Sequence, residues 1–154
     1  MHIEVEYDLL GEAVKSRRIR PLLEKGDVAS ANSLLGYNYF LLGCVEKGLQ
    51  NGTKMGFPTA NIGYDEHKLL PSDGVYKGRI EIDGKIHKAC INIGKNPTFS
   101  AEIRTVEVHI PNFDDDIYGK VVRVEFLEKI RDEIKFSSVE ELIEQIKTDV
   151  ECVL

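Results

Sequence analysis

The sequence predicts a mainly β fold, an antiparallel sheet or barrel, with a short pair of helices before it and one helix after it. Apolar residues recur at helical spacing only before residue 36 and after residue 136. Between these limits they alternate with polar residues, and turn-forming residues recur at short intervals. At 154 residues and 42% hydrophobic, the chain is long enough for one domain with a core.

The first 36 residues predict the helical pair. Apolar residues lie at helical spacing between residues 15 and 24, and Gly26 can end that helix. Asp27 can cap a second helix, which ends before residue 36. We therefore expect a helical segment at residues 1–36, followed by the β domain and its C-terminal helix at residues 37–154.

The middle of the chain predicts strands at residues 37–45, 74–83, 87–93, 105–110 and 121–130. Alternation is clearest at residues 74–83, where apolar residues and glycine occupy one face and Lys77, Arg79 and Glu81 the other. Asp83-Gly84 follows and can supply the positive φ angles of a tight turn, so this stretch and the next strand should form a hairpin.

The last segment predicts an amphipathic helix. Ser137 as N-cap and Glu140 three residues later form a capping box. The apolar stripe consists of Val139, Leu142, Ile143, Ile146 and Val150. This stripe should pack against the β domain.

Composition argues against some classes of partner. Lys and Arg number 20 against 26 Asp and Glu, and a net charge of -6 gives no general attraction for nucleic acid or anionic lipid. The sequence contains neither a run of about 18 apolar residues nor a basic, apolar leader, so we expect no membrane and a cytoplasmic location. Cys44, Cys90 and Cys152 are odd in number and widely spaced, which favours reduced thiols acting as small hydrophobic residues.

A glycine-rich loop offers a first candidate site. Gly48, Gly52 and Gly56 recur every four residues, and Lys54 adds a positive charge. Backbone N–H groups in such a loop can approach phosphates closely. The loop matches neither a P-loop nor a dinucleotide fingerprint, and taken alone it is more typical of a flexible hairpin.

Thr59 and Asn61 offer a second candidate site. They lie two residues apart in an extended segment stiffened by Pro58, so their side chains should point to one side. A hydroxyl and an amide oxygen are ligands that Mg²⁺ accepts when nucleotide phosphates and water complete the coordination shell. The alternative, which the spacing alone favours, is that both side chains cap local backbone groups.

Glu107 is the candidate general base. Val106, Val108 and Ile110 share one face of a predicted strand, so Glu107 and His109 share the other. A carboxylate in a cleft there can accept a proton from an attacking hydroxyl. The alternative is a solvated carboxylate, and His109 is expected at the surface rather than as a ligand.

Two later segments leave alternatives open. Arg131 and Phe136 can present a guanidinium and an aromatic ring to a planar ligand. Equally, Arg131 can pair with Asp132 or Glu133, while Phe136 packs on the C-terminal helix. The acidic run at residues 114–116 lacks the spacing of a calcium loop and predicts a solvated turn.

In order along the chain, these segments resemble the riboflavin kinase family from about Leu42 to the C-terminus. The blocks that carry the resemblance are Gly43 to Gly48, Lys54 to Asn61, Leu70 to Tyr76, Asn92 to Phe99, Glu107 to Ile110, Tyr118 with Gly119, and Arg131 with Phe136. Gly-Phe-Pro-Thr-Ala-Asn is the most specific of them. Two departures are Pro111-Asn112-Phe113, where many bacterial relatives carry Leu-Asp-Phe, and Ile134, where some carry a charged residue.

The resemblance implies a six-stranded antiparallel Greek-key barrel with a C-terminal helix. It implies phosphorylation of riboflavin by ATP at the ribityl 5′-hydroxyl, giving FMN and ADP, with Mg²⁺ as cofactor. By resemblance, the site residues are Glu107 as base, Thr59 and Asn61 at the metal, Gly48, Lys54, Thr59, Ile110, Asn112 and Tyr118 at the nucleotide, and Arg131 and Phe136 at the flavin.

Residues 11–36 resemble the end of the adenylyltransferase half of bifunctional bacterial FAD synthases. Motifs of the His-x-Gly-His type are absent from the sequence, so we expect no FMN adenylyltransferase activity from this chain. An adenylyltransferase domain absent from the chain is a further candidate partner. The rival interpretations are a flavin-binding module without catalysis and a structural barrel that docks such a partner.

Overall fold

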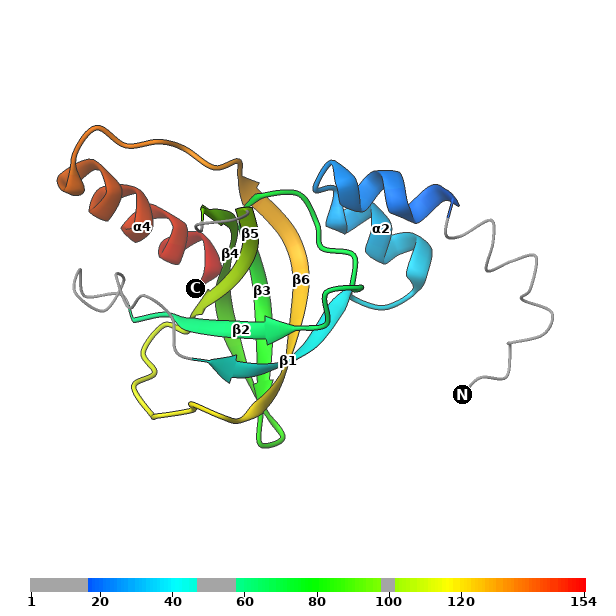
Figure 1. Cartoon of the computed structure of the whole chain (residues 1–154), viewed down its shortest axis with the longest axis horizontal. Helices are drawn as coiled ribbons and strands as arrows, with labels where there is room; N and C mark the ends of the chain where they lie inside the picture. Colours follow the sequence, from blue (N-terminus) through cyan, green and yellow to red (C-terminus); the bar gives the residue numbers. More distant parts are fainter. Residues whose placement is uncertain (1–16, 47–57, 98–101) are drawn as a thin grey trace.

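The computed structural model describes residues 17–46, 58–97 and 102–154. Six antiparallel strands close into a barrel in the order β1-β2-β5-β4-β3-β6 (Figure 1). The strands are β1 Phe40–Glu46, β2 Ala60–Tyr64, β3 Gly74–Ile82, β4 Lys85–Pro97, β5 Glu102–His109 and β6 Val121–Arg131. Strands β3, β4 and β5 lie side by side and β6 returns beside β3, which is a Greek key. The mainly β barrel is confirmed.

Alternation along the strands fills the barrel. Tyr76 and Ile80 of β3 are fully buried, as are Ile91 of β4 and Phe126 of β6. The β3–β4 hairpin turns at Asp83 and Gly84, whose φ angles are 52° and 81°. Both values are positive, as a two-residue type I′ turn requires, so the predicted hairpin is confirmed.

Strand boundaries differ from the predictions in several places: β4 spans Lys85–Pro97 rather than residues 87–93, and β5 begins at Glu102 rather than at residue 105. The first strand begins at Phe40 and ends at Glu46. Strand β2 was not among the predicted strands, although its start was expected to be extended. It has only five residues, and Asn61 and Gly63 among them have low strand propensity, so its pairing with β1 and β5 decides its structure.

The helical pair is part of the barrel's core. One helix occupies residues 17–24, and α2 spans Val28–Leu35. The side chain of Asp27 accepts a hydrogen bond from the Ser30 N–H, and the predicted cap is confirmed. Leu23 is 1% exposed and belongs to the same hydrophobic cluster as the barrel interior.

Two polar contacts join this pair to the strands. The Ser72 N–H donates to the Leu23 carbonyl at 3.0 Å. The Asn32 side chain donates to the Phe126 carbonyl at 2.8 Å and accepts from the Tyr39 N–H at 2.7 Å. Because these bonds satisfy backbone groups on β6 and beside β1, the helical pair is packed against the barrel and is not a separate appendage.

The C-terminal helix α4, Val139–Val153, packs against β3 and β4. Its N-cap is Ser138, which accepts from the Glu141 N–H, while the Ser137 hydroxyl donates to the Glu141 carboxylate at 2.9 Å. The predicted box at Ser137 and Glu140 is therefore one residue too early. Both serines have a glutamate three residues later, so local sequence does not distinguish the two boxes.

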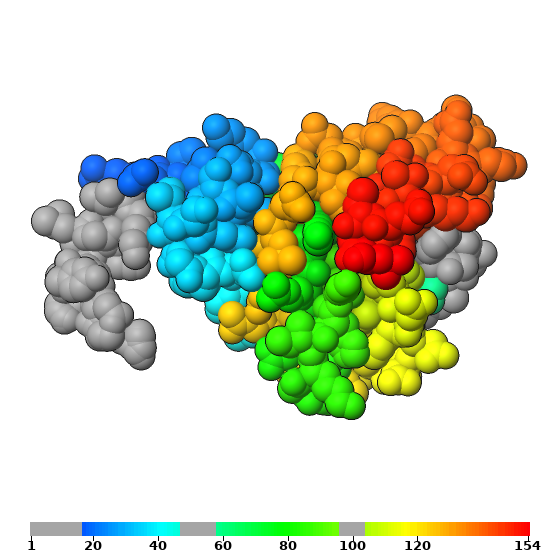
Figure 2. All heavy atoms as spheres, turned by 180° about the vertical axis from the view of Figure 1, so that it is seen from behind, coloured from blue at the N-terminus to red at the C-terminus, as the bar shows by residue number. Residues whose placement is uncertain are grey.

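The apolar stripe of α4 is also shifted. Leu142, Ile143, Ile146 and Val150 are half-buried, whereas Val139 is 58% exposed. Asp149 and Val153 are the buried residues of this helix. In Figure 2, α4 (red) and the helical pair (blue to cyan) cover separate parts of the barrel surface.

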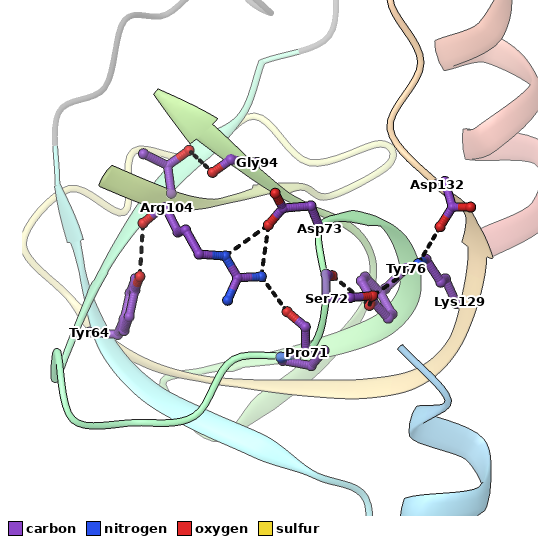
Figure 3. A network of polar contacts seen from close by, with 10 residues as sticks. Tyr64, Pro71, Ser72, Asp73, Tyr76, Gly94, Arg104, Lys129 and Asp132 are labelled. Atoms are coloured by element: carbon purple, nitrogen blue, oxygen red, sulfur yellow. Dashed lines mark hydrogen bonds and ion pairs between the residues drawn. The ribbon is translucent and has the colours of Figure 1, made fainter. Parts of the chain in front are cut away.

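An arginine network fixes the connection between β2 and β3. Arg104 of β5 donates through Nε to Asp73 at 2.8 Å and also to the Pro71 carbonyl (Figure 3). The Tyr64 hydroxyl donates to the Arg104 carbonyl at 2.8 Å. These contacts anchor β5 three residues before Glu107 and so help to set the position of that carboxylate.

The three cysteines are unpaired in the structure, and their exposure differs. Cys44, Cys90 and Cys152 are free thiols. The interpretation as small hydrophobic residues fits half-buried Cys90 but is wrong for Cys44 and Cys152, which are exposed. In the part of the chain that the structure describes, no helix combines the length and apolar character needed to cross a bilayer.

Candidate functional site

A row of polar residues crosses the outer wall of the barrel. Glu107 lies opposite Asn61 of β2 and Asn92 of β4 in the strand register. Its neighbours Val106 and Val108 are buried inside the barrel, so Glu107 points outward as predicted. Residues directly opposite in antiparallel strands share a face, so the three side chains lie in one row.

A cavity of about 290 Å³ lies between this wall and α4. Its lining is Thr59, Val75, Cys90, Asn92, Glu107, His109, Arg131, Glu133, Ile134, Phe136, Leu142, Ile146 and Asp149. Four of these are site residues expected from the resemblance: Thr59, Glu107, Arg131 and Phe136. Glu107 is half-buried there and is not a freely solvated carboxylate.

A second hollow, of about 600 Å³, shares Thr59 with the cavity. Val45, Glu46, Pro58, Thr59, Ala60, Val108, Ile110, Phe113, Ile117, Tyr118 and the acidic run 114–116 line it. Ile110 and Tyr118 therefore lie where they could contact a nucleotide bound in this hollow. Asn112 is exposed and does not line the hollow. The acidic run is exposed as predicted, and Gly48 and Lys54 lie outside the described residues.

Thr59 lines both spaces. Its neighbour Pro58 is held by His109, whose Nδ1 lies 2.8 Å from the Pro58 carbonyl oxygen. His109 therefore ties the end of β5 to the segment just before β2, which contains Thr59. Ligands occupying the cavity and the hollow would approach one another at Thr59.

Asn61 lies apart from the cavity. It lines a third depression together with Glu46, and Glu46 also lines the larger hollow beside Thr59. A hydroxyl, an amide and a carboxylate are the hard oxygen ligands that Mg²⁺ prefers, so these residues fit that ion chemically. Among the described residues, no three His, Cys, Asp or Glu side chains gather as a metal site, so phosphate and water would have to complete the shell.

Arg131 is fixed in the cavity by an ion pair with α4. Its Nε lies 3.0 Å from Asp149 Oδ1 and its Nη2 2.8 Å from Oδ2. The prediction that Arg131 forms an ion pair with Asp132 or Glu133 is wrong, because Arg131 pairs with Asp149. The carboxylate of Asp132 pairs with Lys129, and Asp132 accepts from Arg131 only through its carbonyl oxygen. The guanidinium carbon is 5.8 Å from the centre of the Phe136 ring, so a cation and an aromatic face lie together.

Burial shapes the charges in the cavity. It raises the pKa of Glu107 above the ordinary 4.5. The pKa of Glu133 is also raised, first by burial and then by the negative charge of Asp73, with Glu107 adding to the effect and Arg131 opposing it. Burial raises the pKa of the Cys90 thiol to about 12, so this thiol stays protonated.

Several lining residues were given no role in the site from the sequence, chiefly Asp149, Glu133 and Asn92. Asp149 had a usable signal, because it follows Leu142 and Ile146 on the buried face of an amphipathic helix. A charged residue on such a face needs a partner. Asn92 begins one of the blocks that carry the resemblance, but the local sequence does not show that it lies opposite Glu107 across the sheet.

The family model described as riboflavin kinase (Flavokinase) matches residues 35–154. The chain belongs to the riboflavin kinase family. The bifunctional riboflavin kinase/FMN adenylyltransferase of Bacillus subtilis is 40% identical over 139 residues, which cover 88% of this chain. They cover 44% of the relative, so the chain spans less than half of that protein.

Two solved structures place the riboflavin kinase barrel among known folds. A crystal structure named Macrolide-efflux Protein, from Streptococcus pneumoniae, has a TM-score of 0.85 and 40% identity, covering 90% of this chain and 45% of that one. The riboflavin kinase of Trypanosoma brucei has a TM-score of 0.52 and 31% identity, covering 74% and 76%. The resemblance and the fold that it implied are therefore confirmed, and this is a family of kinases.

Proposed function

We propose that this chain transfers the γ-phosphate of ATP to the ribityl 5′-hydroxyl of riboflavin, giving FMN and ADP. One observation carries the proposal: Thr59 lies in both the 290 Å³ cavity and the 600 Å³ hollow, and Glu107 lies in the former. Riboflavin in the cavity and ATP in the hollow would meet at Thr59. The family and the names of the relatives support the choice of substrates.

The reaction needs a base and a scaffold more than covalent chemistry. The hydroxyl oxygen forms a bond to the γ-phosphorus while the bond from that phosphorus to the β–γ bridging oxygen breaks, and ADP leaves. The proton of the hydroxyl passes to Glu107. Half-burial suits this carboxylate to the task, because a raised pKa makes it a stronger proton acceptor near neutral pH.

Binding would use the two spaces differently. In the cavity, Arg131 and Phe136 would contact the flavin ring, since a guanidinium and an aromatic ring suit a planar heterocycle. In the hollow, Tyr118 and Ile110 would contact the adenosine. Gly48 and Lys54, outside the described residues, and Asn112, outside the lining of the hollow, are proposed nucleotide contacts through the family resemblance alone.

Magnesium is the proposed cofactor, with Thr59 and Asn61 as its protein ligands. Their neutral oxygens fit a cation that also binds phosphate and water, and Glu46 lines one space with Thr59 and another with Asn61. Mg²⁺ bound there would neutralise phosphate charge. Thr59 and Asn61 would then orient the nucleotide by holding its metal complex.

Incubation of the purified chain with riboflavin and MgATP tests the proposal directly. FMN should accumulate, as measured by chromatography, and a sample without ATP should produce none. Binding of riboflavin without formation of FMN would instead favour a flavin-binding module.

Asn61→Ala should raise the magnesium concentration that gives half-maximal rate by about tenfold or more, because one proposed oxygen ligand is lost. The KM for riboflavin should stay within about twofold, since Asn61 is outside the cavity lining. Initial rates over a magnesium titration at constant ATP measure this. An unchanged magnesium dependence would remove Asn61 from the metal site.

The pH profile should report the burial of Glu107. A base must be deprotonated, so kcat/KM for riboflavin should fall as the pH drops through the pKa of Glu107, which burial raises above 4.5. Stability follows the same shift: a raised carboxyl pKa means that this group's stabilising contribution is lost as pH rises through the folded-state pKa. Rates at saturating MgATP should show the acidic limb above pH 4.5, and a limb at or below that value would contradict the assignment.

A further inference from the structure

We propose that Asp149 of α4 is a positioning residue that orients Arg131 for the flavin substrate and thereby sets the affinity for riboflavin. This inference rests on the function proposed above and deepens it. Asp149 was not among the site residues expected from the sequence, and it lies 18 residues after Arg131 on another element. The contact between them joins the barrel wall to the C-terminal helix.

The Arg131–Asp149 ion pair is bidentate, shielded from solvent and held by a third side chain. Nε and Nη2 of Arg131 donate to the two oxygens of Asp149 at 3.0 and 2.8 Å, which is a bidentate arrangement. The side chains of Arg131 and Asp149 are 17% and 3% exposed. Gln145, one helical turn before Asp149, donates at 3.0 Å to Oδ1, the oxygen that also accepts from Arg131 Nε, and so adds a second hold on the carboxylate.

The remaining contact of Arg131 leaves room for a ligand. Nη1 donates to the Asp132 carbonyl oxygen at 3.0 Å. A guanidinium has five N–H groups, and the bonds described above use Nε and one hydrogen on each terminal nitrogen. Two N–H groups thus remain for a ligand in the cavity that Arg131, Asp149 and Phe136 all line.

Asp149 has a competitor for Arg131. Glu133 lines the same cavity, and the positive charge of Arg131 is among the influences on its pKa. If the charge of Asp149 were removed, the guanidinium would be drawn towards Glu133 and away from its position beside the Phe136 ring. The ion pair with Asp149 therefore keeps the Arg131 guanidinium beside Phe136 and prevents it from turning towards Glu133.

Asp149 also neutralises the charge of Arg131 inside the cavity. Riboflavin carries no net charge, and an uncompensated guanidinium would have to lose water to accept it. Leu142 and Ile146 of α4 line the cavity on the same helical face as Asp149. Docking of α4 thus supplies the apolar wall and the orienting carboxylate together.

The test compares Asp149→Asn with Glu151→Gln, which makes the same change of carboxylate to amide at an exposed position of the same helix. Asp149→Asn should weaken riboflavin binding, measured by equilibrium dialysis, by about 10- to 100-fold, as expected for loss of a charge-assisted hydrogen bond. The KM for riboflavin should rise in parallel, while the KM for ATP stays within about twofold. Glu151→Gln should match the wild-type chain.

A double-mutant cycle shows whether the effect passes through Arg131. In the Arg131→Met background, Asp149→Asn should change riboflavin affinity by less than about twofold, because the residue it positions is gone. Circular dichroism and thermal melting accompany each variant. If Asp149→Asn does not fold, Gln145→Ala takes its place, with an expected loss of affinity of about three- to tenfold.

The outcomes separate this inference from the proposed function. Wild-type affinity in the folded Asp149→Asn variant, or an equal loss with and without Arg131, would overturn the positioning role while leaving the kinase proposal standing. For Gln145→Ala, unchanged affinity would do the same. A wild-type chain that neither binds nor phosphorylates riboflavin would overturn both proposals.

Discussion

Replacing Glu107 with Gln should lower kcat by about 10²- to 10⁴-fold, the usual contribution of a general base. The amide has nearly the shape of the carboxylate but cannot accept the proton of the attacking hydroxyl. Because Glu107 lies on the outer face of β5, between buried Val106 and Val108, the barrel interior is unaffected. Steady-state rates with riboflavin and MgATP measure the loss.

Stability separates this effect from misfolding. Burial raises the pKa of Glu107, so the fold disfavours its ionised form and a neutral side chain should leave the melting temperature at pH 7 equal or higher. Glu128→Gln on β6 is the matched control, an exposed strand carboxylate that should keep wild-type activity. A fully active Glu107→Gln variant would remove Glu107 from the mechanism.

Replacing Leu23 with Ala should destabilise the whole barrel by about 2–5 kcal/mol, the range for truncating a buried leucine. Leu23 is 1% exposed in the shared hydrophobic cluster, and its backbone carbonyl accepts the Ser72 N–H. Removing its side chain leaves a cavity at the junction of the helical pair and the barrel. Urea denaturation followed by circular dichroism should give one transition at a lower midpoint.

The neighbouring Leu22→Ala serves as the control, because Leu22 is only partly buried and its loss should be smaller. If the helical pair were an independent appendage, the unfolding midpoint of the barrel would stay the same in Leu23→Ala. Such a result would mean that residues 17–35 contribute nothing to the stability of the kinase barrel.

Much of the fold can be predicted from sequence patterns that extend over only a few residues. Alternation marks β3 and its partner, and Asp83-Gly84 marks the turn between them. Ser137 and Ser138 both have a glutamate three residues later and could each be the N-cap of α4, and the sequence-based choice of Ser137 was wrong. Strand β2 was missed because its five residues are strand-like only when paired on both sides.

The candidate site divides in the same way. Thr59, Glu107, Arg131 and Phe136 were named from motifs and meet in one cavity. Asp149 was not named, because its role depends on a contact across 18 residues between a strand and a helix. Asn61 faces Glu107 across the strands yet lines a separate depression, and its role in metal binding stays a prediction.

By itself, the sequence determined the family, the antiparallel character of the domain, its tight hairpin turn and the outward direction of Glu107. These follow from periodicity, turn chemistry and motif order, which act over a few residues. The tertiary structure alone decided which side chains share a cavity, that α4 supplies a carboxylate to Arg131, and that the helical pair belongs to the barrel's core. Those features depend on contacts between segments far apart in the sequence, which only closure of the barrel and packing of the helices on it bring together.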